Sequence, residues 1–307
     1  MKLLAVGSMA YDAIETPFGK TDKILGGAAS YIGLAASVMK VDVSLVTVVG
    51  EDFHREYLEM FERKNINIEG VEIVKGGKSF FWSGKYSLDL NTRDTLITEV
   101  NVLADFDPKI PPHGSESEVL LLGNLDPKVQ LSVLHKMKKR PKLVILDTMN
   151  FWMNSTWDSL MKVIAETDVI TINDEEARQL SREYSLIKAA KKIHAMGPKY
   201  VIIKKGEHGA ILFYKDEIFA LPALPLEEVF DPTGAGDAFA GGFAAYLTKT
   251  EDLSFENMKK AIVVGSAMAS RTVEKFGTKS IENYTNEELK ERIKQFQGLT
   301  AFESLTV

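Results

Sequence analysis

Short apolar runs alternate along the chain with longer segments of mixed polarity. The runs are rich in valine, isoleucine and leucine, and they cover residues 3–6, 43–49, 119–122, 143–146, 169–172 and 200–203. Runs this short and this apolar predict strands that are buried on both faces. Segments of helical length lie between them, at residues 28–39, 53–64, 128–138 and 186–196. This alternation predicts an α/β fold with a mainly parallel central sheet and helices on both sides.

Two segments break the alternation, at about residues 11–25 and 77–101. Both are typical of extended, half-exposed strands, and together they predict a small β-sheet that projects from the main domain as a lid. In the second segment Phe80, Trp82 and Tyr86 fall on one face at period two. This face would serve internal packing, a dimer contact or a ligand contact. No linker or repeat divides the chain, so residues 1–307 are expected to form a single domain that carries the lid.

Composition narrows the class of protein. The net charge of -6 comes from acidic and basic residues that are interspersed, without the concentrated basic face that nucleic-acid binding requires. The chain has no cysteine, which excludes disulfides and thiolate metal sites and fits the cytoplasm. No apolar run approaches the ~18 residues of a membrane span. We therefore expect a cytoplasmic protein with neither nucleic acid nor membrane as a partner.

The stretch DPTGAGDAFAGGF, which begins at Asp231, contains the strongest chemical signal. Asp231 as N-cap and Pro232 as first helical residue would explain its start. That interpretation leaves Gly234, Gly236 and Asp237 unexplained, although each glycine costs about 0.8–1 kcal/mol in a helix interior. Glycines at a helix N-terminus let backbone amides approach an anion closely. A carboxylate beside such amides suits the transfer of a phosphoryl group with movement of a proton. The spacing of a P-loop occurs nowhere in the chain.

The motif DPTGAGDAF is similar to the C-terminal signature of the ribokinase (PfkB) family of carbohydrate and nucleoside kinases. The resemblance covers nearly the whole chain. GGAASYIGLAAS, at residues 26–37, resembles the N-terminal glycine signature, and KKGEHGA resembles the nucleotide-binding G-x-x-G turn at Gly206 and Gly209. INDEEARQL carries the family's N-x-x-E at Asn173 and Glu176. The resemblance implies a ribokinase-like three-layer α/β/α sandwich and an ATP-dependent kinase.

The resemblance assigns the phosphoryl-transfer step to the same turn. Asp237 would be the general base that takes the proton from the acceptor hydroxyl. The amides of Gly234, Ala235 and Gly236 would form the anion hole for the charge that develops on the γ-phosphoryl group.

The acceptor side is expected to involve residues from the first half of the chain. Asp12 corresponds to the family aspartate that holds sugar hydroxyls, and Gly26 and Gly27 would let the backbone lie against the substrate. Tyr31 stands where the family often has an asparagine, so the substrate is expected to be larger, flatter or less hydroxylated than a simple sugar. Asn150 is a weaker candidate, at the place of a family D-x-N motif.

The nucleotide side has two open alternatives. Asn173 and Glu176 have the spacing of a capping box, but the resemblance implies that they hold water on Mg²⁺ beside the phosphates. Asp231 and Thr233 lie where several relatives bind an activating monovalent cation such as K⁺, and the helix-start interpretation of Asp231 is equally good. Thr233 is also a nucleotide-binding candidate.

The leading functional prediction is therefore phosphorylation of a hydroxyl of a sugar or sugar-like molecule by ATP. A nucleoside kinase is the alternative within the class, favoured by Tyr31 and the aromatic lid face. A catalytically silent sugar or nucleotide sensor is the alternative outside it, although a sensor has no need of Asp237. Lid sheets of this kind also predict a homodimer.

Overall fold

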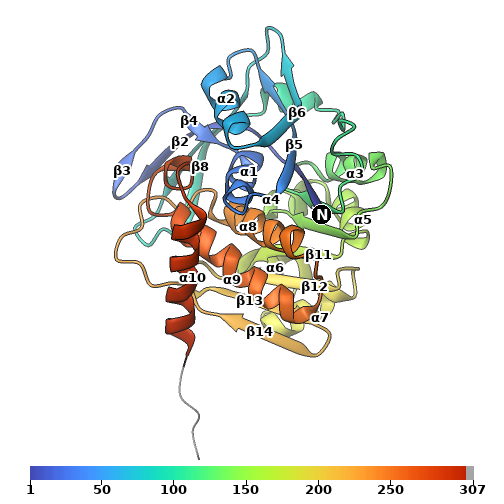
Figure 1. Cartoon of the computed structure of the whole chain (residues 1–307), viewed down its shortest axis with the longest axis vertical. Coiled ribbons are helices and arrows are strands. Elements are labelled where there is room, and N and C mark those ends of the chain that lie inside the picture. Colours follow the sequence, from blue (N-terminus) through green and yellow to red (C-terminus); the bar gives the residue numbers. More distant parts are fainter. Residues whose placement is uncertain (302–307) are drawn as a thin grey trace, which may run out of the picture.

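A nine-stranded sheet runs through the centre of the molecule (Figure 1). The computed structural model describes residues 1–301, so the last six residues of the predicted domain lie outside the described residues. The strand order is β14-β13-β12-β11-β10-β9-β1-β5-β6. The strands are β1 (Lys2–Val6), β5 (Asp42–Gly50), β6 (Ile66–Val74), β9 (Val119–Leu122), β10 (Leu143–Asp147), β11 (Val169–Asn173), β12 (Tyr200–Lys204), β13 (Ala210–Tyr214) and β14 (Glu217–Leu221).

The sheet is parallel from β12 to β6, and β13 and β14 add antiparallel pairs at one edge. All the strands predicted from apolar runs are present. The sequence interpretation did not include β6, β13 and β14. The edge strands β6 and β14 carry partly exposed, more polar residues, whereas β13 is a short apolar run that was overlooked. The mainly parallel sheet of the prediction is confirmed.

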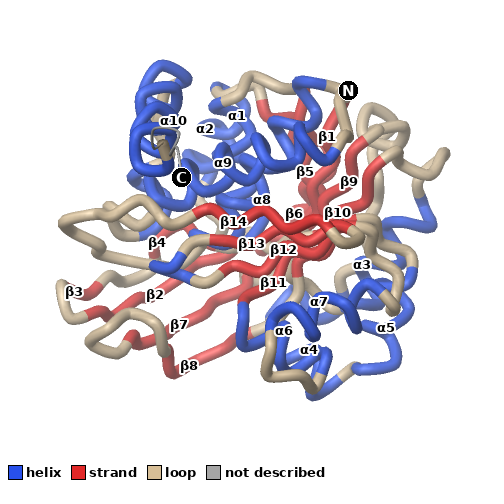
Figure 2. Tube along the Cα trace, turned by 90° about the horizontal axis from the view of Figure 1, so that it is seen from below, coloured by secondary structure: helices blue, strands red, loops and turns tan. Residues whose placement is uncertain are grey.

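Helices cover both faces of the sheet (Figure 2). One face carries α1 (Ala28–Val38), α2 (Arg55–Arg63), α8 (Ala235–Thr250), α9 (Phe255–Thr272) and α10 (Asn286–Thr300); the other carries α3 (Pro127–Lys136), α4 (Asn150–Ser155), α5 (Trp157–Ala165), α6 (Asp174–Ser181) and α7 (Leu186–His194). Along β1, Leu3 and Ala5 join the core under the first group, whereas Leu4 and Val6 join the core under the second. This alternation gives the three-layer sandwich that was predicted. Short 3-10 helices are η1 (Asn101–Asp105), η2 (Gly206–His208) and η3 (Gly277–Ser280).

A separate five-stranded sheet forms the predicted lid. Its strands are β2 (Ala10–Thr16), β3 (Gly19–Lys20), β4 (Ile24–Gly26), β7 (Phe80–Tyr86) and β8 (Arg93–Glu99), in the order β3-β2-β7-β8 with β4 on β2. Asp12 of β2 is paired with Trp82 of β7, and Tyr86 of β7 is paired with Arg93 of β8. Paired residues share a face of a sheet, and residues four apart on one strand also share it. Asp12, Trp82, Tyr86 and Arg93 therefore lie on one face.

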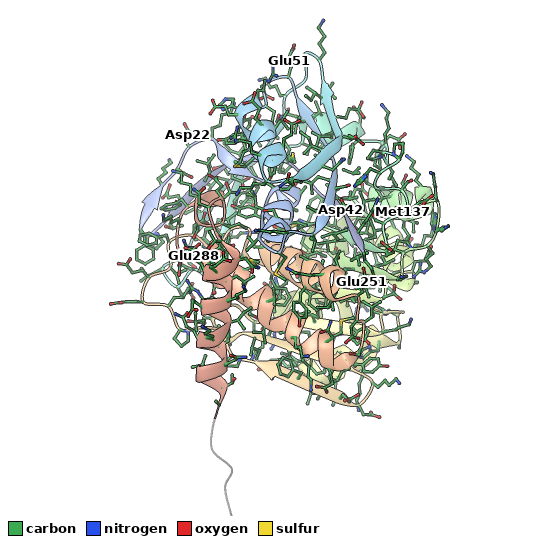
Figure 3. The ribbon with its side chains drawn as sticks, in the orientation of Figure 1. Asp22, Asp42, Glu51, Met137, Glu251 and Glu288 are labelled. Atoms are coloured by element: carbon green, nitrogen blue, oxygen red, sulfur yellow. The ribbon has the colours of Figure 1, made fainter. Side chains whose placement is uncertain are left out.

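Helix α8 is anchored at its C-terminal end and packs closely against α1 along its length. Glu251 follows its last residue and is labelled in Figure 3; its carboxylate pairs with the amino group of Met1. Along the helix, a side chain on Gly241 would lie 2.6 Å from the carbonyl oxygen of Ile32, so α8 and α1 are in close backbone contact. This contact brings Tyr31 of α1 toward the first turn of α8. None of the helices within residues 1–301 combines the length and the apolar character that crossing a membrane requires.

Candidate active site

Polar side chains gather where consecutive parallel strands end. β10 ends at Asp147, β11 at Asn173 and β12 at Lys204, and Asn173 is paired in register with Lys204. The carboxyl edge of a parallel sheet is where ligands bind in open α/β folds. The first turn of α8 reaches this edge, because the Lys204 ammonium lies against Gly236. The site is therefore built from three strand ends and one helix start.

The start of α8 differs from the prediction. Asp231 is not the N-cap and Pro232 is not helical, because α8 begins at Ala235 and Gly234 is its N-cap, with a left-handed φ of 75°. The buried Asp231 carboxylate is used elsewhere: Oδ1 accepts from the amide of Thr233 at 2.9 Å and Oδ2 from the amide of Gly277 at 2.8 Å. Asp231 thus fixes the loop before α8 to η3.

Both glycines of the GAG sequence have a close neighbour: a side chain is excluded at Gly234, whereas at Gly236 it would have to displace the end of a flexible lysine. A Cβ on Gly234 would lie 2.3 Å from Cζ of the Tyr31 ring, and a Cβ on Gly236 would lie 3.0 Å from Nζ of Lys204. The Ala235 amide donates to the carbonyl oxygen of Pro232 at 3.2 Å. Within residues 1–301 the amides of Gly234 and Gly236 have no hydrogen-bond acceptor. Of the three amides of the GAG sequence, these two remain available to an anion.

Asp237 lies in the first turn of α8 and is the central acid of the site. Its pKa is raised to about 7: burial and then the carboxylate of Asp147 raise it, and the charges of Lys204 and Arg93 partly offset them. A carboxyl group with a pKa near neutrality is a better proton acceptor at physiological pH than an ordinary one. This position therefore suits a general base.

Lys204 and Asp147 form an ion pair beside Asp237, with 3.2 Å between Nζ and Oδ1. Burial opposes the charge of the Lys204 ammonium, but the carboxylates of Asp147, Glu176 and Asp237 outweigh burial and raise its pKa. The sequence interpretation missed Lys204. Its signal was its place directly after the predicted strand 200–203, in line with Asp147 after strand 143–146.

Asn173 and Glu176 form the capping box at the start of α6. The Glu176 amide donates to Oδ1 of Asn173, and the Asn173 amide donates to Oε2 of Glu176, both at 2.7 Å. The pKa of Glu176 is raised to about 7, mainly by burial and also by Asp147, and Lys204 partly offsets this. The capping interpretation is therefore correct for the backbone, and the same carboxylate also borders the site.

The acceptor candidates come from β2, β4 and α1. Asp12 is 4% exposed and its carboxylate covers Gly26, where a Cβ would lie 1.9 Å from Oδ2. Burial, together with Asp231 and Asp237, raises the pKa of Asp12 to about 8. Gly27 is the N-cap of α1.

Tyr31 is buried, and its hydroxyl has no partner within the described chain. Burial raises its pKa well above the usual value, and the nearby carboxylates of Asp12 and Asp231 raise it further. The phenol therefore keeps its proton and remains a hydrogen-bond donor.

The lid contributes Tyr86 and Trp82 of the predicted aromatic face, and Arg93, which the sequence interpretation did not select. The Tyr86 hydroxyl hydrogen bonds to Oγ1 of Thr233 at 3.0 Å, which docks the lid on the turn before α8. The exposed Arg93 guanidinium lies 5.3 Å from the ring centre of Trp82. Its charge also lowers the pKa of Asp237. Arg93 has no local signal, because its role depends on pairing between β7 and β8.

Three candidates lie away from this centre. Asn150 begins α4, and in the described chain no hydrogen bond links it to the other site residues. Gly206 begins η2 and Gly209 follows it, in the connection between β12 and β13. The lid also reaches this connection, because the Asn91 amide donates to the Glu207 carboxylate at 3.4 Å.

A half-buried carboxylate of near-neutral pKa beside two available helix-start amides, on a three-layer α/β fold, defines a phosphotransferase-type site. The family follows directly: a model described as pfkB family carbohydrate kinase matches residues 1–284, and the chain belongs to this family.

Relatives named as nucleoside kinases are among the proteins most similar to this chain. A cytidine kinase of Thermococcus kodakarensis is 30% identical over 285 residues, which cover 92% of this chain and 99% of that protein. A nucleoside kinase of Methanothermobacter thermautotrophicus is 26% identical, with 94% of each chain covered. The crystal structure of a Methanocaldococcus jannaschii nucleoside kinase has a TM-score of 0.77 at 22% identity, with 96% of this chain and 99% of that chain covered.

These findings confirm the predicted fold and class. The chain has the ribokinase fold and is a kinase that transfers a phosphoryl group from ATP to a hydroxyl of a sugar or nucleoside.

Proposed function

We propose that the acceptor is a nucleoside, phosphorylated on a hydroxyl of its sugar. The observation that carries the kinase mechanism is Asp237, half-buried beside the available amides of Gly234 and Gly236. The nucleoside is supported by the relatives named cytidine kinase and nucleoside kinase. It is also supported by the aromatic rings of Tyr31 and Trp82 close to Asp12, which suit a flat base attached to a hydroxylated ring.

In the reaction, the Asp237 carboxylate accepts the proton of the acceptor hydroxyl. The oxygen attacks the γ-phosphorus, the bond from that phosphorus to the bridging oxygen breaks, and ADP leaves. The transition state is loose, so the burden lies on positioning and on stabilising charge. The Gly234 and Gly236 amides would donate to the oxygens of the transferring group, while the Ala235 amide stays within its turn.

The acceptor would be held from the lid side and from α1. The Asp12 carboxylate can accept hydrogen bonds from two sugar hydroxyls. The unpartnered Tyr31 hydroxyl would donate to a third polar atom, which satisfies its own buried group. Gly26 lets the Asp12 carboxylate lie against the backbone, and Gly27 packs on the backbone of Ser8, so these two glycines would support Asp12 and would not border the sugar ring. Asn150 is a weaker contact candidate.

The nucleotide would lie along the β11 and β12 ends, with Asn173, Thr233, Gly206 and Gly209 near it. Glu176 fits a role in holding a water on Mg²⁺. Within residues 1–301 no cluster of three or more acidic or histidine side chains could hold a metal by itself. Magnesium in such sites is bound largely through nucleotide oxygens and waters, and it neutralises phosphate charge there.

Asp231 is our candidate for a K⁺ site beside the turn. Its carboxylate oxygens each accept one backbone amide, and further lone pairs remain for a cation. Activity that rises with KCl, and does not rise with NaCl at equal ionic strength, would support the site. Equal activity in the two salts would contradict it.

The test of the proposed function is ADP release with magnesium over a panel of sugars, deoxy sugars, polyols and nucleosides. Nucleosides should saturate the enzyme and free sugars should not. Asp237→Asn should lower turnover by roughly 10²–10⁴-fold and still bind ATP. Asp158→Asn, an exposed acid on α5, is the matched control and should keep full activity.

Other outcomes choose between the alternatives. Turnover with sugars alone would make the protein a sugar kinase. Ligand binding without any turnover would favour the sensor. A homodimer through the lid sheet and a cytoplasmic location remain predictions.

A further inference from the structure

The stability of the fold does not explain why residue 204 is a lysine. Its side chain is 18% exposed and its partner Asp147 is 9% exposed. An ion pair this buried loses much of its attraction to desolvation, and a pair of apolar side chains would serve the fold as well. The pair therefore calls for a functional explanation.

The ammonium of Lys204 lies at the anion-binding turn itself. A Cβ on Gly236 would be 3.0 Å from Nζ, and Gly236 supplies one of the two available amides. An ammonium and a backbone donor that border the same space form a combined site for an anion. The absence of a side chain at Gly236 is what lets the ammonium come this close.

The surrounding charge makes a cation necessary when a triphosphate arrives. Asp147, Glu176 and Asp237 all lie close enough to act on the Lys204 ammonium. Carboxylates repel a phosphoryl group, and the two backbone amides carry only partial charges. Among these groups, Lys204 is the one that carries a full positive charge.

We propose that Lys204 is a phosphoryl-binding catalytic residue, whose ammonium exchanges its contact with Asp147 for the γ-phosphate of ATP and follows that group during transfer. Lysine suits this role because it is a flexible point charge. The ammonium keeps its protons throughout; Asp237 alone accepts the proton of the acceptor, so the charge balance of the transfer is unchanged. This inference rests on the proposed kinase function.

The experiment compares the binding of ATP and ADP with magnesium, measured by titration calorimetry without an acceptor. Lys204→Met should weaken ATP binding roughly tenfold or more while ADP binding changes little, because only ATP carries the γ-phosphate. Lys162→Met, which removes an exposed lysine of α5 that forms no ion pair within residues 1–301, is the control and should leave both affinities unchanged. With a nucleoside acceptor, kcat should fall roughly 10²-fold in Lys204→Met.

A second variant keeps the test decisive if Lys204→Met fails to fold. Lys204→Met combined with Asp147→Asn removes both charges, so that no buried carboxylate is left alone. The double variant should show the same selective loss of ATP binding. Lys204→Arg keeps the positive charge and should therefore keep part of the native affinity for ATP.

Variants that keep the native ratio of ATP to ADP affinity would overturn the role of Lys204 and leave the kinase function intact. A native protein that binds no ATP would overturn both.

Discussion

At the scale of single residues, the site is organised by mutual electrostatics of buried acids. The pKa values of Asp12, Glu176 and Asp237 are all raised by burial, and Lys204 lowers those of Glu176 and Asp237. Each acid is thereby kept near the point where it can gain or lose a proton at physiological pH. The protonation of the site should therefore control both activity and stability.

Activity should rise with pH and level off above neutrality. Asp237 must be ionised to accept a proton, and its pKa is about 7, so kcat/KM for the acceptor should increase with a midpoint near 7. Asp147→Asn should move this midpoint to lower pH, because Asp147 raises the pKa of Asp237. A pH profile of kcat/KM for the acceptor, recorded at saturating MgATP, measures the midpoint of the native protein and that of Asp147→Asn. A midpoint unmoved in Asp147→Asn would contradict the assignment, and Asp158→Asn should leave it in place.

Replacing the base should stabilise the protein at high pH. An acid whose pKa is raised in the folded state binds more protons folded than unfolded, so its contribution to stability is lost as pH rises from about 4 through 7. Asp237→Asn carries no such charge. Its melting temperature should exceed that of the native protein at pH 8, and the difference should shrink toward pH 5. A melting temperature below the native one at pH 8 would show that ionised Asp237 is held favourably.

At the scale of elements, the first turn of α8 depends on what each glycine touches. Gly234→Ala should destabilise the fold strongly, because it meets both a left-handed φ of 75° and the Tyr31 ring. Gly236→Ala should fold nearly normally but lose activity, since its methyl group displaces only the mobile end of Lys204. Thermal melts and ADP release distinguish the two. Equal stability of the two variants would contradict this division.

The lid sheet should open more often when the hydrogen bond between Tyr86 and Thr233 is removed. Tyr86→Phe deletes the hydrogen bond to Thr233, which is worth about 0.5–1.5 kcal/mol. Amides of β8 should then exchange hydrogen roughly two- to tenfold faster, as mass spectrometry would record. Tyr184→Phe, at a tyrosine that is 87% exposed, provides the control. Unchanged exchange in Tyr86→Phe would mean that other contacts hold the lid.

Much of this element pattern could be predicted from the sequence. A short apolar run predicts a buried strand such as β1, and alternation at period two predicts the lid strand β7. The glycine-rich composition of the turn before α8 predicts that turn. β6 was missed because its apolar positions are diluted by exposed polar ones. Lys204 was missed although its place directly after a predicted strand was a signal. Arg93 was missed because its role arises from pairing between β7 and β8, which local patterns do not encode.

At the scale of the whole molecule, the lid has an unpaired edge. Every residue of β8 is exposed, and Leu96 and Ile97 are 56% and 47% exposed. Edges of this kind invite pairing with another strand. The chain should therefore sediment at about twice its mass of 34.1 kDa, and Leu96→Lys with Ile97→Lys should sediment at 34.1 kDa. Leu88→Lys, in the lid turn, is the control. A native protein of single-chain mass would contradict the dimer.

Asp12 belongs to the lid sheet, whereas Asp237, Asp147 and Lys204 belong to the central sheet and the helix packed on it. In the proposed function, selection of the acceptor and transfer of the phosphoryl group are thus carried by different pieces of the polypeptide. The two pieces can change independently during evolution: a new lid face can admit a new acceptor while the chemical step is inherited intact. Exchange of lid strands between members of the family is accordingly a direct route to engineered acceptor preference.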